Sequence, residues 1–70
     1  MIRKQVSSSN IRSIGFELES LTLEIEFNTG SIYQYYDVPA SVHDSLMEAR
    51  SHGSYFSRHI KDRYRWRKMK

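Results

Sequence analysis

The sequence predicts a small α+β fold, and three observations support this prediction. Residues 21–27 alternate apolar and polar side chains, which is the period of a strand with one buried face. Residues 28–30 read Asn-Thr-Gly, which suits a three-residue hairpin loop before a second strand. After Pro39 the apolar spacing becomes helical. We therefore expect a three-stranded antiparallel meander packed against one main helix, with a second short helix and an extended basic C-terminal segment.

The strands can be placed one by one. The first strand is expected over about residues 11–16, where Ile14 and Phe16 alternate with small or polar residues. In the following hairpin, Gly30 should take the left-handed conformation that glycine adopts cheaply. That loop predicts the pairs Phe27 with Ser31, Ile25 with Tyr33 and Leu23 with Tyr35. The two tyrosines resemble the base-stacking pair of an RNA-recognition motif, but this register places them on the apolar face, so we expect them in the core.

Two helices are expected after the hairpin. Pro39 suits the first turn of the main helix, because its missing N–H is not needed there. The apolar stripe of this helix has three residues at helical spacing: Val42, Leu46 and Ala49. Gly53 should end the helix as a left-handed cap. Ser54 should then cap a second short helix, in which Phe56 and Ile60 are four residues apart on one face.

The last ten residues, 61–70, form a basic tail in which cations alternate with large aromatic side chains. Residues 50–70 carry eight Lys or Arg against one acid, Asp62, for a net charge of +7, whereas the rest of the chain carries −4. A period of two puts Tyr64 and Trp66 on one side of this segment and its arginines on the other. We expect Trp66 to be largely buried as a lid on the core, and the arginine head groups to lie in water.

Several short motifs occur in a defined order along the chain: Val6-x-Ser8, Ile14-Gly15-Phe16, Leu23-x-Ile25-x-Phe27, Gly30, Tyr33-x-Tyr35, Val38-Pro39, Ala49-x-Ser51-x-Gly53-x-Tyr55-Phe56 and Ile60…Tyr64. In this order they resemble the KTSC domain, a family named for the C-terminus of some lysyl-tRNA synthetases and also found as small bacterial and phage proteins. The resemblance covers about residues 6–66. We expect one domain over residues 1–70, with a core at about 6–66 and the basic tail at 61–70. The resemblance implies RNA as a partner and carries over no catalytic residues.

The predicted function is non-catalytic binding of RNA or single-stranded DNA through the basic end of the chain. Cations neutralise phosphates, and exposed aromatic side chains stack on bases at ~1–3 kcal/mol per base. The expected binding residues are Arg58, His59, Lys61, Arg63, Arg65, Arg67 and Lys68, with Tyr55 or Trp66 stacking if exposed. The alternative is a protein–protein interaction module, including a self-associating one, in which an acidic strand face meets the basic tail. That solvated face would comprise Glu17, Glu19, Glu24 and Glu26.

Other classes of function have little support in the sequence. His43, His52 and His59 lack the i, i+4 spacing of a helical zinc pair and no cysteine accompanies them, so we expect no metal and no other cofactor. No arrangement of residues indicates a catalytic triad, so we expect no enzymatic activity. No apolar run approaches the ~20 residues of a membrane span, and no apolar signal segment follows residues 1–4. We therefore expect a cytoplasmic protein without a membrane partner.

Overall fold

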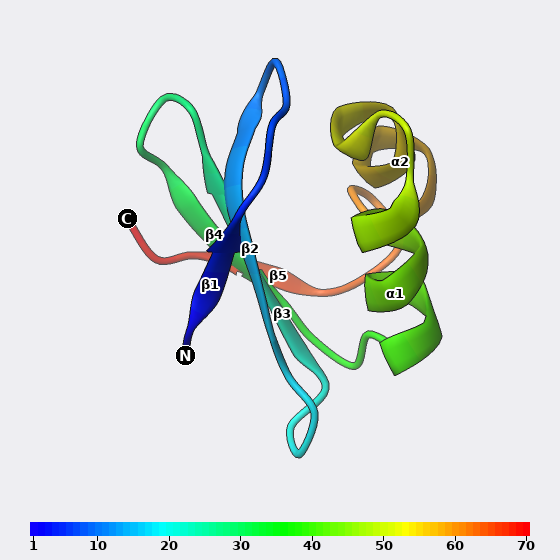
Figure 1. Cartoon of the computed structure of the whole chain (residues 1–70). Helices are drawn as coiled ribbons and strands as arrows, with labels where there is room; N and C mark the ends of the chain where they lie inside the picture. Colours follow the sequence, from blue (N-terminus) through cyan, green and yellow to red (C-terminus); the bar gives the residue numbers. More distant parts are fainter.

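The computed structural model describes all residues, 1–70, and shows one antiparallel sheet with two helices on one side (Figure 1). The strands are β1 (Arg3–Gln5), β2 (Ile11–Glu17), β3 (Thr22–Phe27), β4 (Ile32–Tyr35) and β5 (Trp66–Lys68), and their order in the sheet is their order in the chain. The helices α1 (Ala40–Glu48) and α2 (His52–His59) lie between β4 and β5 in the sequence. Neither helix is long and apolar enough to cross a membrane. The α+β class is confirmed, but the sheet has five strands where three were predicted.

The β3–β4 hairpin has the register that the sequence predicts. Ile25 pairs with Tyr33, and Leu23 pairs with Tyr35. Gly30 has φ +96°, in the left-handed region that favours glycine. Because a slip of one residue would turn every side chain to the other face, this pairing decides which residues of the hairpin reach the core.

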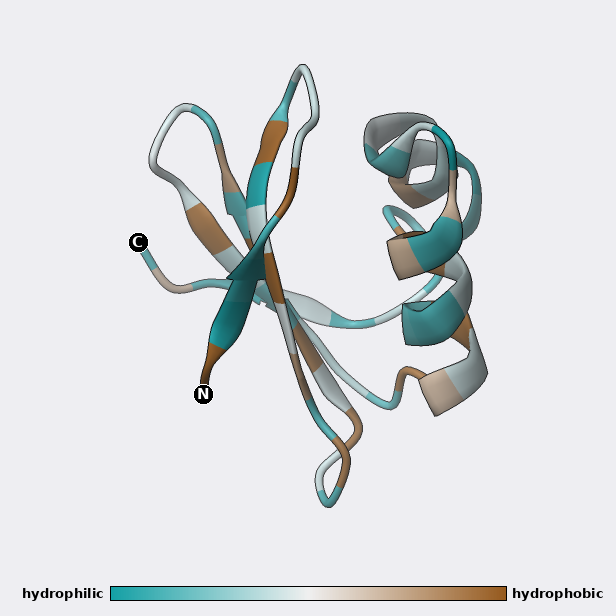
Figure 2. Ribbon diagram, in the orientation of Figure 1, coloured by the Kyte–Doolittle hydropathy of each residue, from teal (hydrophilic) through white to brown (hydrophobic).

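The core lies between the sheet and the helices. It consists of nine buried apolar residues: Ile11, Ile14, Leu23, Ile25, Tyr35, Val38, Leu46, Phe56 and Ile60. Figure 2 shows the apolar positions spaced along the strands and separated by more hydrophilic ones, as a sheet with one buried face requires. The expected core role of Tyr35 is confirmed, and Tyr33 packs half-buried against the same cluster. Neither β1 nor β5 contributes a residue to the core.

The helical region differs from the prediction in where the chain turns. α1 ends at Glu48 and the next residue is already extended, so the helix does not continue to Gly53. Ser51, and not Ser54, caps α2: the Ser51 hydroxyl accepts a hydrogen bond of 3.2 Å from the Ser54 N–H. Gly53 lies buried in the first turn of α2, where a Cβ would collide with the Asn10 side chain. The glycine is therefore explained by close packing and not by a left-handed cap.

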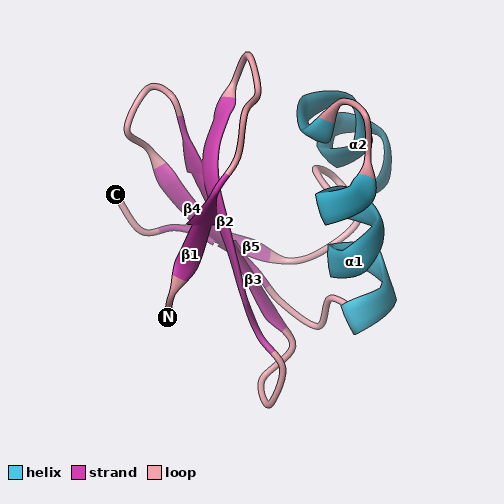
Figure 3. Cartoon of the chain, viewed as in Figure 1, coloured by secondary structure: helices cyan, strands magenta, loops and turns pink.

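We call the side of the sheet covered by the helices the inner face, and the opposite side the outer face (Figure 3). Strand β1 was not predicted, because its residues lack apolar alternation. It pairs with β2 so that Arg3 lies opposite Gly15. From there the Arg3 guanidinium donates a hydrogen bond of 2.9 Å to the Ser13 hydroxyl and forms an ion pair with Glu24. Polar contacts on the outer face, and not burial of apolar side chains, thus anchor this strand.

Candidate nucleic-acid interface

The basic tail forms the last strand of the sheet and the turn that precedes it. Residues 60–63 form a turn, so the period of two begins later than predicted, and the strand itself covers only Trp66–Lys68. Its three pairs with β4 are Trp66 with Tyr35, Arg67 with Gln34 and Lys68 with Tyr33. Because side chains alternate along a strand, Trp66 and Lys68 lie on the inner face and Arg67 lies on the outer face.

The prediction that Trp66 is buried is wrong. Trp66 does lie on the core-facing side of β5, and its ring packs against Tyr33 with centroids 5.5 Å apart. However, its side chain is 54 % exposed. Helix α2 reaches the sheet through Phe56, whose ring meets those of Phe27 and Tyr35 at 5.5 and 5.4 Å. Trp66 lies one strand further out than Tyr35, where no comparable ring covers it, so the tryptophan stays exposed on the inner face, which it shares with Lys68.

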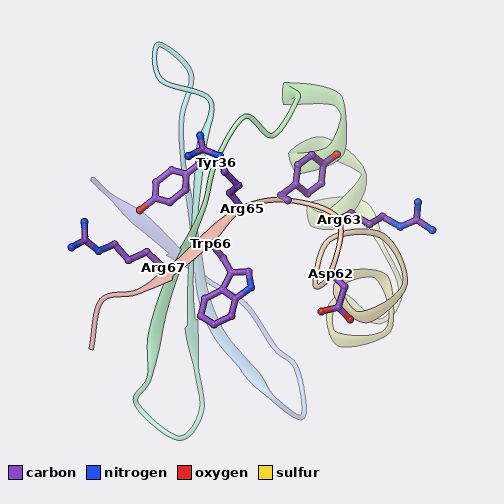
Figure 4. A pocket seen from close by; sticks show the side chains of 7 residues that line it. Tyr36, Asp62, Arg63, Arg65, Trp66 and Arg67 are labelled. Atoms are coloured by element: carbon purple, nitrogen blue, oxygen red, sulfur yellow. The ribbon is translucent and has the colours of Figure 1, made fainter.

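An open hollow of about 810 Å³ surrounds β5 and the turn before it. Seven residues line this hollow: Tyr36, Asp62, Arg63, Tyr64, Arg65, Trp66 and Arg67. In Figure 4, the Trp66 indole extends from β5 on the side opposite to Tyr36 and Arg67. The hollow therefore has Trp66 on one side of β5, and Tyr36 with Arg67 on the other.

The cations near β5 form few and weak ion pairs within the chain. The Arg65 guanidinium lies 5.6 Å from the centroid of the Tyr36 ring, and its Nη2 is 3.2 Å from Asp37 Oδ2. Both members of the Arg65–Asp37 pair are exposed, and such pairs contribute at most ~1 kcal/mol. Arg67 and Lys68 form no ion pair in the structure. These three charges are therefore available to a polyanion.

The other predicted binding residues lie on α2 or on the turn after it. Tyr55 is half-buried and its ring lies 4.5 Å from that of His59, so the expected exposure of Tyr55 is only partial. Arg58 is exposed, and its carbonyl accepts a hydrogen bond of 3.2 Å from Arg63 Nε. Lys61 lies on the rim of a groove on the inner face. Four of the predicted residues thus line the hollow around β5, namely Arg63, Arg65, Trp66 and Arg67, and the other five do not.

His43 and His52 each contact another part of the fold. His43 stacks on Phe16 with ring centroids 4.8 Å apart. The Nδ1 atom of His52 lies 2.8 Å from the carbonyl oxygen of Leu46, at the junction of the two helices. No group of three or more His, Cys, Asp or Glu side chains is placed to hold a metal ion.

Of the four glutamates predicted to form a solvated face, Glu17 and Glu19 are exposed, whereas Glu24 is buried and Glu26 is half-buried. Glu24 is 8 % exposed and accepts hydrogen bonds from Gln34, at 2.8 Å, and from Arg3. Glu26 accepts a hydrogen bond of 2.8 Å from the Ser13 hydroxyl and lies 3.8 Å from Arg3 Nη2. Burial acts to raise the pKa of Glu24, but the hydrogen bonds from Gln34 and Arg3 and the charge of Arg3 outweigh it and lower the pKa. These carboxylates are neutralised within the chain.

A second depression, the inner-face groove of about 540 Å³, lies beside Trp66 and was not predicted. Its aromatic walls are formed by Phe27, Tyr33, Tyr35, Phe56 and Trp66, and Lys61 and Asp62 contribute to its rim. Burial, followed by the charges of Tyr33 and Asp62, raises the pKa of Tyr35 to about 12. The Tyr35 hydroxyl is therefore protonated at neutral pH. The signal that could have pointed here is Asp62, the only acid in residues 50–70.

The chain resembles known proteins in both sequence and fold. Residues 7–64 match the model of the KTSC domain. A protein of Stutzerimonas stutzeri is 42 % identical over 64 residues, which cover 91 % of this chain and 90 % of that protein. A lysine–tRNA ligase of Nostoc punctiforme is 38 % identical over 61 residues, and the match spans 87 % of this chain but only 11 % of the ligase. The crystal structure of a KTSC domain protein from Yersinia pestis has a TM-score of 0.96 and 40 % identity, covering 99 % of this chain and 97 % of that one.

Proposed function

The chain belongs to the KTSC domain family, and on this premise we propose that it is a binding module for single-stranded nucleic acid, with RNA as the first ligand. The observation that carries the proposal is the exposure of Trp66 on an edge strand that also carries Arg67 and Lys68, two cations without an ion-pair partner. An exposed aromatic side chain beside cations is the combination that single-stranded nucleic acid requires. The lysine–tRNA ligase among the relatives supports RNA as the ligand, because its name includes one.

Stacking supplies the part of the affinity that does not depend on charge. One side of the Trp66 indole packs against Tyr33, and the exposed remainder offers an apolar surface to an unstacked base. Such stacking contributes ~1–3 kcal/mol per base and tolerates any sequence, because every base has a π-face. Tyr36, on the outer face, is half-buried and has Arg65 over its ring, so it offers less free surface.

Phosphate contacts supply the remainder. Arg65 directly precedes the edge strand β5, and Arg67 and Lys68 lie within it; their only acidic partner is the exposed Asp37, which pairs with Arg65. Each cation that neutralises a phosphate releases a condensed counterion, so binding should weaken as salt increases. We therefore expect affinity in the micromolar range at low salt and a steep loss of affinity at higher salt.

The test uses the single tryptophan of the chain as its own reporter. Titration with a short uridine-rich RNA and with the matching single-stranded DNA should quench or shift Trp66 fluorescence if a base stacks on it. Fluorescence polarisation of the labelled oligonucleotide gives the affinity independently at two salt concentrations. Absence of binding by polarisation at micromolar protein and low salt would contradict the proposal, and binding without any change in Trp66 fluorescence would contradict the stacking role.

Protein–protein interaction remains the second candidate. It needed an acidic strand face that could meet a basic tail, but Glu24 and Glu26 are held by cations and hydroxyls of their own chain. No observation in the structure favours it over the nucleic-acid proposal. If the protein binds neither RNA nor DNA in the titration, protein–protein interaction becomes the leading proposal.

A further inference from the structure

We propose that the inner-face groove is a pocket for a single unstacked guanine base and that Asp62 is the residue that recognises it. The inference rests on the proposed nucleic-acid binding and adds a base preference to it. The groove has a volume of about 540 Å³, within the range of ~300–1,000 Å³ that is usual for small-molecule sites.

The aromatic walls of the groove are already packed in place. Tyr33 contacts Trp66 at 5.5 Å on one side and Phe27 at 5.7 Å on the other, measured between ring centroids. Phe56 closes the wall next to the helix through its edge contacts with Phe27 and Tyr35. A base that enters this groove meets preformed apolar surface, so little side-chain ordering opposes its binding.

Asp62 is the one feature of the groove that a sequence-independent phosphate-binding surface would not need. It lies between Lys61 and Arg63 in the sequence, yet its exposed carboxylate forms no ion pair and no hydrogen bond in the structure. It contributes to the rim of the groove, and its charge reaches Tyr35 in the wall strongly enough to help raise the pKa of that phenol. A negative charge here repels phosphates, so its favourable role in our proposal is a direct contact with the base.

Guanine is the base whose hydrogen-bonding edge fits a carboxylate. An ionised aspartate only accepts hydrogen bonds, through two oxygens. The Watson–Crick edge of guanine carries two adjacent donors, N1–H and the N2 amino group, which can bind both oxygens at once. The same edge of adenine, cytosine or uracil places at least one acceptor beside its donor, and that acceptor would face the carboxylate. Unpaired bases in single strands are recognised through these edges.

Aromatic walls with a nearby acid also suit a methylated ammonium group. The charge of the surrounding segment argues against that ligand, because residues 50–70 carry a net charge of +7. A cationic peptide would be repelled as it approaches, whereas the phosphates on either side of a base would be attracted to Lys61 and to the cations of β5. A base held within a polyanion is therefore the occupant that the charge favours.

The experiment compares labelled RNA pentamers that differ only in the central base, set within uridines: guanine, adenine, cytosine, uracil and inosine. Guanine should bind at least about five-fold more tightly than adenine, cytosine or uracil, the lower end of what a bidentate contact discriminates. Inosine lacks the 2-amino group and should lose most of this advantage. Asp62→Asn should remove the preference for guanine while the all-uridine pentamer binds equally or more tightly, because one negative charge is removed.

Asp44→Asn is the matched control, because it makes the same change at an exposed position on α1 and should leave the guanine preference intact. Melting curves of both variants show whether the fold is kept. Binding of all pentamers without preference, or a guanine preference that survives Asp62→Asn, would overturn the guanine pocket and leave the proposed function standing. Failure to bind any pentamer would overturn both. A trimethyl-lysine peptide that binds more tightly than the pentamers would assign the groove to a cation.

Discussion

The two edge strands of the sheet each carry an arginine on the outer face, and the two arginines have opposite roles. Arg3 in β1 reaches Ser13 and the buried Glu24, so its charge is neutralised inside the chain. Arg67 in β5 lies opposite Gln34, an uncharged residue, and forms no ion pair. Glu24 lies on the central strand β3, two strands from each edge, so the difference comes from what lies between. Arg3 lies opposite Gly15, which has no side chain, and reaches Glu24, whereas Arg67 lies opposite Gln34, which itself donates a hydrogen bond to Glu24. Counting cations in a sequence therefore overestimates a binding surface, since only the cations that the fold leaves unpaired can bind phosphates.

The sharpest test of this comparison is the stability of two alanine variants. Arg3→Ala should lower the free energy of unfolding by about 2–3 kcal/mol, because it leaves the nearly buried Glu24 carboxylate without its cation. Arg67→Ala should change it by no more than about 0.5 kcal/mol, as is usual for exposed surface positions. Urea unfolding measures both. A cost for Arg67→Ala as large as that for Arg3→Ala would break the comparison.

Trp66→Ala tests whether β5 serves binding more than stability. The affinity for a single-stranded RNA should fall about ten-fold, which corresponds to the removal of one stacked base. The free energy of unfolding should fall by only about 1 kcal/mol, because the exposed side chain has one aromatic contact, with Tyr33. Polarisation and urea unfolding give the two values. A large decrease in stability with unchanged affinity would mean that Trp66 stabilises the core and does not bind the ligand.

The pH dependence of stability tests the neutralised Glu24 of β3, the partner of Arg3. The fold lowers the pKa of Glu24, so this group contributes stability at pH values above its unfolded pKa of ~4.3, and the contribution is lost as pH falls through the folded pKa. Glu24→Gln should therefore be less stable than the wild type at pH 7, and the difference should shrink in acid. Glu19→Gln, at an exposed position, is the control and should follow the wild-type curve.

The smallest expected effect concerns the salt dependence of binding. Replacing Arg65 and Arg67 by glutamine should make the log–log slope of affinity against salt shallower by about 0.7 for each phosphate that the protein no longer neutralises. Arg12→Gln removes the same charge from an exposed arginine that lies 3.8 Å from Glu26, and the slope should not change. Titrations at several salt concentrations compare the variants. Equal flattening by all of these substitutions would mean that net charge, and not the position of β5, governs binding.

The parts of the fold that could be predicted are those fixed by neighbours in the sequence. Strict alternation in residues 21–27 and the left-handed Gly30 leave one register for the hairpin, and that register was confirmed. Strand β1 could not be found in this way, because Arg3 is held by Ser13 and Glu24, which are 10 and 21 positions away in the chain. The break between the helices was misplaced for a similar reason: Gly53 is required by its packing against the side chain of Asn10, which is far away in the sequence.

The sequence indicated which residues belong to the candidate site, but not how the fold places and covers them. Alternation correctly gave the side of the strand on which Trp66 lies, but burial also depends on what covers that side. The sequence does not show that α2 reaches the sheet only as far as Tyr35. It also cannot show that Arg58 and Arg67, both cations of the same segment, lie beside different depressions of the surface.

Strand β5 belongs to the sheet but contributes none of the nine core residues. A domain of 70 residues has only a few kcal/mol of stability to lose, so most domains of this size cannot easily change the residues that hold them together. Here the β5 residues that we propose to contact a ligand lie outside the core and can mutate at little cost to folding. The scaffold is therefore well suited to acquire new ligands during evolution by changes in one short strand, and a designer could replace that strand to install a chosen specificity.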